Sequence, residues 1–140
     1  MNAILELLER KNQFLSEFFD LNEREIVQFQ QSNFDQLDYF YQARESLLEI
    51  IHHIDEKIDE LQVALGEYSP TDDEKVSLKK SLTTKDNFVH KILSQDLVIL
   101  QCIDDEKSAI IRELQEVQKN KKGISAYKSP TFHKTLDEEV

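Results

Sequence analysis

The sequence predicts an all-α fold, in which residues 1–120 form an antiparallel bundle of three long helices with coiled-coil-like packing. Among the 140 residues only two are Gly and two are Pro, so the chain has few of the residues that make tight turns. Charged residues make up 32% and apolar residues 39% of the chain, a composition typical of long amphipathic helices. The third observation is an unbroken apolar repeat across residues 37–65, in alternating steps of three and four residues.

The first helix is expected over about residues 3–31. Apolar residues recur there at three- and four-residue steps when Asn12 and Asn22 are counted in the same register. Each asparagine is expected either to hydrogen-bond across a helix pair or to sit at a solvated edge. Asn33 is expected to cap the second helix together with Gln36, because such a pair satisfies free amide groups of the first turn. The apolar residues of this stripe are Leu5, Leu8, Leu15, Phe19, Ile26 and Phe29.

The second helix, expected over about residues 34–65, carries the strongest pattern in the sequence. Its period of 3.5 residues predicts a left-handed, nearly parallel packing against neighbouring helices. Arg44 is the single polar residue in the repeat. The positions of the repeat are Leu37, Phe40, Arg44, Leu47, Ile51, Ile54, Ile58, Leu61 and Leu65.

The second helix is expected to end at Gly66, because glycine suits the position past a helix end and proline the first position of the next helix. Ser69 is expected to cap the following segment, with Pro70 as its first residue. The acids at positions 72–74 would then lie at the positive end of a helix dipole, where negative charge is stabilising.

The third helix is expected over about residues 85–120, after a cap at Thr83-Thr84. The polar, weakly patterned residues 70–82 are expected to form a short helix or an irregular linker. Residues 121–140 are first basic and then acidic and have no apolar period, so a mobile tail is expected there. The expected core face of the third helix consists of Val89, Ile92, Asp96, Ile99, Ile103, Glu106, Ile110, Leu114 and Val117.

Acidic residues outnumber basic ones by 28 to 17, which gives a net charge of −11 at pH 7. Phosphate groups repel such a surface, so general binding to nucleic acid or to an anionic membrane is not expected. The charge is uneven, because residues 1–74 have a net charge of −13 and residues 75–140 a net charge of +2. We therefore expect the acidic hairpin of the first two helices to pack against the third.

A cytoplasmic location is expected from three features of the sequence. The single cysteine, Cys102, cannot form an internal disulfide, which favours a reducing compartment. No apolar run approaches the roughly 18 residues that a membrane span needs. The first residues place acids among leucines and have no basic lead, unlike a secretory signal.

No familiar catalytic motif is present in the sequence, and we expect a protein that is not an enzyme and has no cofactor. His52 and His53 are adjacent, so on a helix they point about 100° apart and are expected to lie on a solvated face without binding metal. Cys102 flanks the apolar stripe and is expected to be a half-buried small hydrophobe. The carboxylates at 104–106 are expected to form a solvated face, because catalytic carboxylates need unlike environments.

Two helices carry more apolar residues than a single stripe requires. One interpretation is a three-helix core, in which two neighbours widen each apolar face. The other is a hydrophobic groove that receives an amphipathic helix from another protein. The additional residues are Ile4, Leu7, Phe14, Phe18 and Leu21 in the first helix, and Phe88, Leu93, Leu97, Leu100 and Ile111 in the third.

Three segments resemble the small flagellar type III export chaperones of the FlgN/FliT kind. The segment Asn33-Phe34-Asp35-Gln36-Leu37 is similar to the family's turn, and Arg44-Glu45-Ser46-Leu47-Leu48 to the opening of its second helix. The segment Lys121-Lys122-Gly123-Ile124-Ser125-Ala126-Tyr127-Lys128 is similar to its basic, Tyr-containing end. The order of helices, polar loop and tail also matches.

The resemblance implies a cytoplasmic, ATP-independent chaperone. Such proteins bind the C-terminal helices of flagellar axial proteins (hook–filament junction or filament-cap subunits) and deliver them to the export apparatus. The expected partner-binding residues are Leu93, Leu97, Leu100 and Ile111 in the groove and Tyr127 as a tail anchor. A coiled-coil adaptor or scaffold that acts through helix–helix oligomerisation is the alternative. The sequence does not decide whether the protein forms a homodimer. Binding of nucleic acid or membrane is not expected.

Overall fold

The computed structural model describes residues 1–124, with side chains described through residue 121. The helices are α1 (Asn2–Gln30), α2 (Leu37–Leu65) and α3 (Asp72–Ile124), and the described residues contain no strand. The all-α prediction with three long helices is therefore confirmed. The chain divides into two units, Met1–Ile99 and Leu100–Val140, and each is described by itself.

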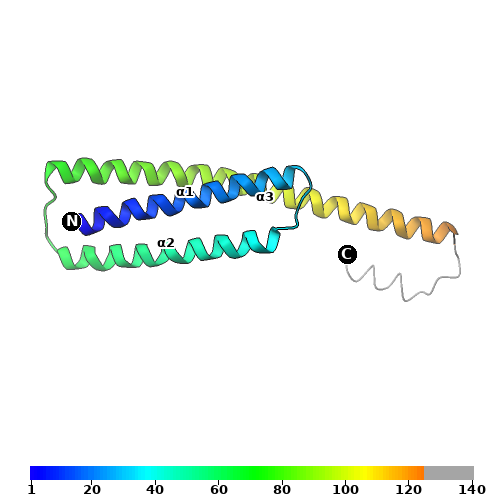
Figure 1. Cartoon of the computed structure of the whole chain (residues 1–140), viewed down its shortest axis with the longest axis horizontal. Coiled ribbons are helices and arrows are strands. Elements are labelled where there is room, and N and C mark those ends of the chain that lie inside the picture. The colour runs from blue at the N-terminus through cyan, green and yellow to red at the C-terminus, as the bar shows by residue number, and fades with distance from the viewer. Residues whose placement is uncertain (125–140) are drawn as a thin grey trace. The chain divides into compact units, whose positions relative to one another are not determined.

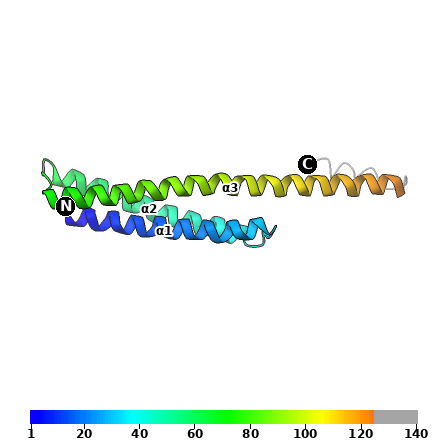
Figure 2. The same cartoon turned by 90° about the horizontal axis from the view of Figure 1, so that it is seen from above.

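The first unit contains α1, α2 and residues 72–99 of α3. In Figures 1 and 2 these segments lie side by side, with α2 running in the opposite direction to the other two. α1 therefore has two helical neighbours, α2 and the first part of α3. This arrangement is the predicted antiparallel bundle, and short connections at Gln31–Gln36 and Gly66–Thr71 link its helices.

The core of the first unit lies between the three helices as two apolar clusters. Burying each large apolar side chain contributes about 1.5–3 kcal/mol to stability. The additional apolar residues of α1 are largely used here, because Ile4 and Phe18 are both core residues. For α1 the interpretation as a wide core face is therefore correct. The clusters are Ile4, Leu8, Ile54 and Ile58 in one, and Leu15, Phe18, Ile51 and Ile92 in the other.

The connection from α1 to α2 is closed by backbone hydrogen bonds. The amide of Asn33 donates to the carbonyl of Gln28 at 2.9 Å and that of Ser32 to the carbonyl of Phe29 at 2.9 Å. This is the pattern of a helix end whose next residue is left-handed, and Ser32 has φ of 58°. The prediction that Asn33 caps α2 is wrong, because its side-chain oxygen accepts the amide of Asp35 and α2 begins only at Leu37.

Substituting Ser32→Gly is expected to stabilise the protein by about 0.5–1 kcal/mol. A left-handed conformation is strained for a residue with a Cβ, and glycine adopts it without that strain. The measurement is urea denaturation followed by circular dichroism. Gln31→Gly is the matched control, because Gln31 has φ of −93° and glycine there only adds unfolded-state freedom. A Ser32→Gly variant no more stable than the native protein would contradict the role of this turn.

The start of α3 differs from the prediction. Thr71, not Ser69, caps the helix, because its hydroxyl accepts the amide of Glu74 at 3.2 Å while the Thr71 amide donates to the Glu74 carboxylate at 2.9 Å. The Tyr68 hydroxyl donates to the same carboxylate at 2.8 Å. These hydrogen bonds, that from the Thr71 amide first, lower the pKa of the Glu74 carboxyl. The predicted end of α2 at Gly66 is confirmed, with φ of 59°.

The segment predicted as a short helix or irregular linker, residues 70–82, is from residue 72 onward the first part of α3, and the predicted cap at Thr83-Thr84 lies inside this helix. Their apolar pattern is weak, but tertiary contacts hold them. Leu78 packs against the first core cluster, and the Asn12 side chain donates to the carbonyl of Ser81 at 3.0 Å. Packing against α1 therefore stabilises as helix a segment whose weak apolar pattern does not by itself predict a long helix.

In the second unit the described residues, 100–124, all belong to α3. In its predicted apolar stripe, Ile103 and Leu114 are half-buried, whereas Ile110 and Val117 are exposed, contrary to the prediction that they belong to the core face. The predicted extension of the bundle to residue 120 stays a prediction. Residues 125–140, most of the predicted tail, lie outside the described part of the chain.

Candidate protein-binding surface

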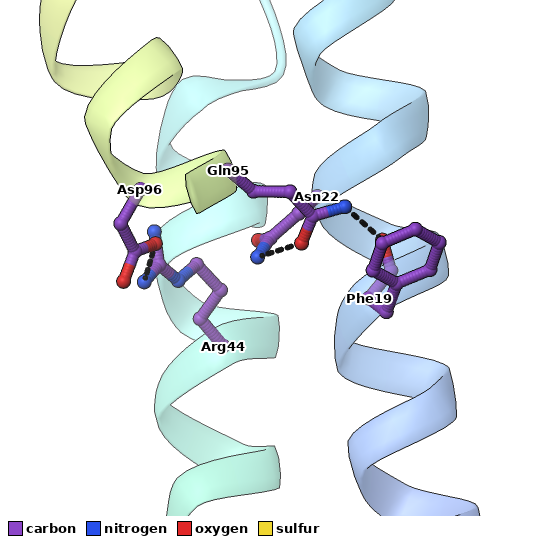
Figure 3. Close-up of polar contacts among 5 residues, drawn as sticks. All are labelled: Phe19, Asn22, Arg44, Gln95 and Asp96. Atoms are coloured by element: carbon purple, nitrogen blue, oxygen red, sulfur yellow. Dashed lines mark hydrogen bonds and ion pairs between the residues drawn. The ribbon is translucent and has the colours of Figure 1, made fainter. Parts of the chain in front are cut away.

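A buried polar layer joins α1 to α3 in the first unit. Asn22 is fully buried, and its side-chain nitrogen donates to the amide oxygen of Gln95 at 2.9 Å. The nitrogen of Gln95 donates in turn to the carbonyl of Phe19 at 3.0 Å (Figure 3). It also donates to the carboxylate of Glu23 at 2.8 Å. Asn12 also bonds to α3, so the predicted hydrogen bonds across helices are confirmed for both asparagines.

An ion pair beside this layer joins α2 to α3. A guanidinium nitrogen of Arg44 lies 2.9 Å from a carboxylate oxygen of Asp96, as Figure 3 shows. The guanidinium also lies over the rings of Phe18 and Phe40, 5.0 and 5.3 Å from their centroids, a favourable cation–π geometry. The polar positions that interrupt the repeats of α2 and α3 thus pair with each other and align the two helices.

The polar layer also sets which side of α3 faces the core. Gln95 is buried, so the face that contains it turns inward together with Ile92 and Ile99. Val89, predicted as a core residue, is displaced to the edge of this face and is 39% exposed. Phe88, predicted in the additional stripe, packs against the second core cluster instead. The prediction for Val89 is wrong because Gln95 turns inward, whereas the position of Phe88 agrees with the interpretation in which the additional residues widen the core face.

This orientation leaves an apolar stripe of α3 outside the core of the first unit. We call it the α3 apolar surface. Its residues follow one another at steps of seven, four and four, so they share one side of the helix. Leu93 is 57% and Leu97 71% exposed. The surface consists of Leu82, Val89, Leu93 and Leu97.

One exposed leucine of α2 lies at the same level of the bundle as part of this surface. Arg44 and Asp96 lie opposite each other, and α2 and α3 run antiparallel, so the next turn of α2 lies beside the preceding turn of α3. This places Leu48, which is 52% exposed, at the level of Leu93. The sequence reasoning missed Leu48, whose position one turn from Arg44 was the available signal.

The predicted site residues fall into three groups. Leu93 and Leu97 lie together on the α3 apolar surface. Leu100 and Ile111 belong to the second unit, where Leu100 is exposed, Ile111 is half-buried, and about three helical turns separate them. Tyr127 lies outside the described residues. The structure therefore places two of the five residues on one surface of the first unit.

The residues that could carry other chemistry are dispersed. His52 and His53 are exposed and contact the same carboxylate, Glu56, at 2.9 and 3.7 Å. Cys102 is half-buried, as predicted. Within residues 1–124 no three His, Cys, Asp or Glu side chains come close enough together to hold a metal ion. In the same part of the chain, no helix combines the length and the apolar character that crossing a membrane requires.

Comparisons with protein-family models, with curated proteins and with solved structures found no match to this chain.

Proposed function

We propose that the protein is an ATP-independent export chaperone that covers the amphipathic C-terminal helix of a flagellar axial protein and delivers it to the type III export apparatus. The observation that carries the proposal is the α3 apolar surface, which remains exposed outside the two core clusters of the first unit. The resemblance of three segments to the FlgN/FliT kind of chaperone supplies the class of client. Such binding needs no catalytic group and no cofactor.

The energetics of this surface suit a reversible complex. Covering an exposed leucine recovers about 1.5–3 kcal/mol, so the α3 apolar surface can supply several kcal/mol to a docked helix. Part of this gain is offset by the loss of translational and side-chain freedom. An affinity of about micromolar, near −8 kcal/mol, would hold a client and still release it without chemistry.

The exposed acids of α2 and the net charge of the chain support the role of keeping a complex in solution. α2 presents exposed acids on the outside of the first unit, and the whole chain carries a net charge of −11. Net charge of this size opposes self-association. The exposed acids of α2 are Asp38, Glu45, Glu49, Glu56, Asp59 and Glu60.

The double substitution Leu93→Asp with Leu97→Asp is expected to weaken client binding by about 100-fold or more. Both side chains are exposed, so the helices should remain intact. The measurement is co-purification with co-expressed hook–filament junction and filament-cap subunits, with helicity followed by circular dichroism.

The matched control is Val63→Asp, an equally acidic change at an exposed apolar residue of α2 that is 82% exposed. Val63→Asp should retain the client. Undiminished client binding by the Leu93, Leu97 variant would exclude the α3 apolar surface as the site.

A coiled-coil adaptor or scaffold is the second candidate. One feature of the second unit favours it, the continued apolar repeat through Ile103, Ile110 and Leu114, which a second copy could cover. Sedimentation over a concentration series separates the two functions. A stable oligomer whose size does not change with concentration favours the scaffold, and a monomer that binds axial subunits favours the chaperone.

A further inference from the structure

A cavity of about 510 Å³ lies beside the α1–α2 connection in the first unit. Its walls come from the last three turns of α1 and from Gln36 and Tyr39 at the beginning of α2. Most of the lining is apolar or uncharged, with Leu21 and Val27 on α1 and Tyr39 on α2. The cavity is therefore distinct from the α3 apolar surface, because it involves other residues and does not involve α3.

Glu25 is one of the residues that line this cavity. The residue is only 7% exposed, and its Oε1 atom is buried without any hydrogen-bond partner. Burial raises the pKa of this carboxyl. Arg24 lines the same cavity, yet in the described part of the chain no cation lies within ion-pair distance of Glu25. A buried carboxylate without a partner is unfavourable in the free protein.

We propose that the cavity binds an arginine side chain presented by a partner protein, with the Glu25 carboxylate as its acceptor. A guanidinium has five N–H donors in a planar fork, which matches a carboxylate and leaves donors for the side-chain oxygen of Gln36. Leu21 and Val27 would contact the apolar stem. The exposed ring of Tyr39 offers a face for cation–π contact.

A cation of this shape fits the site better than a metal ion does. Hard metal ions need several oxygen ligands, and Glu25 is the one carboxylate in the lining. No cluster of three metal-ligating side chains exists within the described residues. A guanidinium needs only one carboxylate and an apolar channel for its stem. The inference does not depend on the proposed function, because an arginine could be presented by any protein partner.

The test uses the full-length ¹⁵N-labelled protein and a small probe, N-acetyl-arginine N-methylamide, titrated by NMR. The neutral isostere N-acetyl-citrulline N-methylamide is the reference ligand. Saturable shifts at about millimolar probe are expected for amides lining the cavity, and none with the citrulline compound. Glu25→Gln should lower the affinity for the arginine probe by about tenfold or more. Glu17→Gln, an exposed carboxylate on the same helix, should leave binding unchanged.

A second measurement separates a binding role from a purely structural one. Because the free protein buries an unpaired carboxylate, Glu25→Gln should raise the melting temperature at neutral pH by about 3 °C. The same substitution should lower the affinity for the arginine probe. A carboxylate that only stabilises the fold would give a lower melting temperature. That result, equal binding of the two probes, or unchanged binding in the Glu25→Gln variant would each overturn the proposal. Failure here leaves the test on Leu93 and Leu97 unaffected.

Discussion

Substituting Phe40→Ala is expected to lower the free energy of unfolding by about 3–5 kcal/mol. Phe40 is fully buried at the start of α2. Its ring meets that of Phe29 edge-on, with centroids 5.8 Å apart, and lies under the guanidinium of Arg44. Removing the ring leaves a cavity and takes away both contacts. Guanidinium chloride denaturation followed by circular dichroism measures the change.

The matched control for this prediction is Tyr39→Ala, the neighbouring aromatic residue of α2. Tyr39 is 66% exposed, so its loss should change stability by only about 0.5 kcal/mol. A loss of less than about 1 kcal/mol for Phe40→Ala would mean that the hairpin end is not packed as described.

Substituting Arg44→Ala is expected to lower the free energy of unfolding by about 2 kcal/mol. The change removes the ion pair with Asp96, the stem of the side chain, and the cation–π contacts with Phe18 and Phe40. The two charged side chains are only 19% and 33% exposed, so water compensates the loss incompletely. Urea denaturation of each variant gives the value.

A double-mutant cycle separates the charge from the packing. Arg44→Met keeps much of the stem and should cost less than Arg44→Ala, and Asp96→Asn removes only the partner charge. We expect a coupling energy of about 1 kcal/mol between positions 44 and 96. Additive effects of Arg44→Met and Asp96→Asn would show that the aromatic packing of Arg44, and not its ion pair, aligns α2 with α3.

Much of the first unit follows from its sequence. The repeat of α2 is regular enough to predict that helix, and Ile51, Ile54 and Ile58 are buried as the repeat requires. The asparagines of α1 break an apolar stripe, which is a signal that they bond across helices, and Asn22 does so. These features depend on periodicity within one segment, and periodicity can be read along the chain.

The α3 apolar surface was only partly predictable. Leu93 and Leu97 were expected as additional apolar residues, whereas Val89 was expected in the core. Two registers of α3 fit its sequence almost equally well, and the choice depends on a partner from α1. The buried amide of Asn22 needs a hydrogen bond, and Gln95 supplies it by turning into the core.

The cavity at Glu25 could not be predicted from sequence at all. A glutamate in an acidic helix is expected to be exposed, and nothing in the chain separates Glu25 from its exposed neighbour Glu23. Glu25 lines a cavity together with Gln36 and Tyr39 at the beginning of α2, so its surroundings depend on a segment outside its own helix. The turn at Ser32, which local backbone hydrogen bonds close, connects these two segments.

By itself, the sequence determined that the chain forms three long helices and which residues of α2 face inward, because helical period and scarce glycine and proline are local properties. Only the tertiary structure decided where α3 begins, which side of α3 faces the core and that the Glu25 carboxylate is buried. Those outcomes depend on contacts between residues as distant along the chain as Asn22 and Gln95, since most buried polar groups need a hydrogen-bond partner and another segment supplies it.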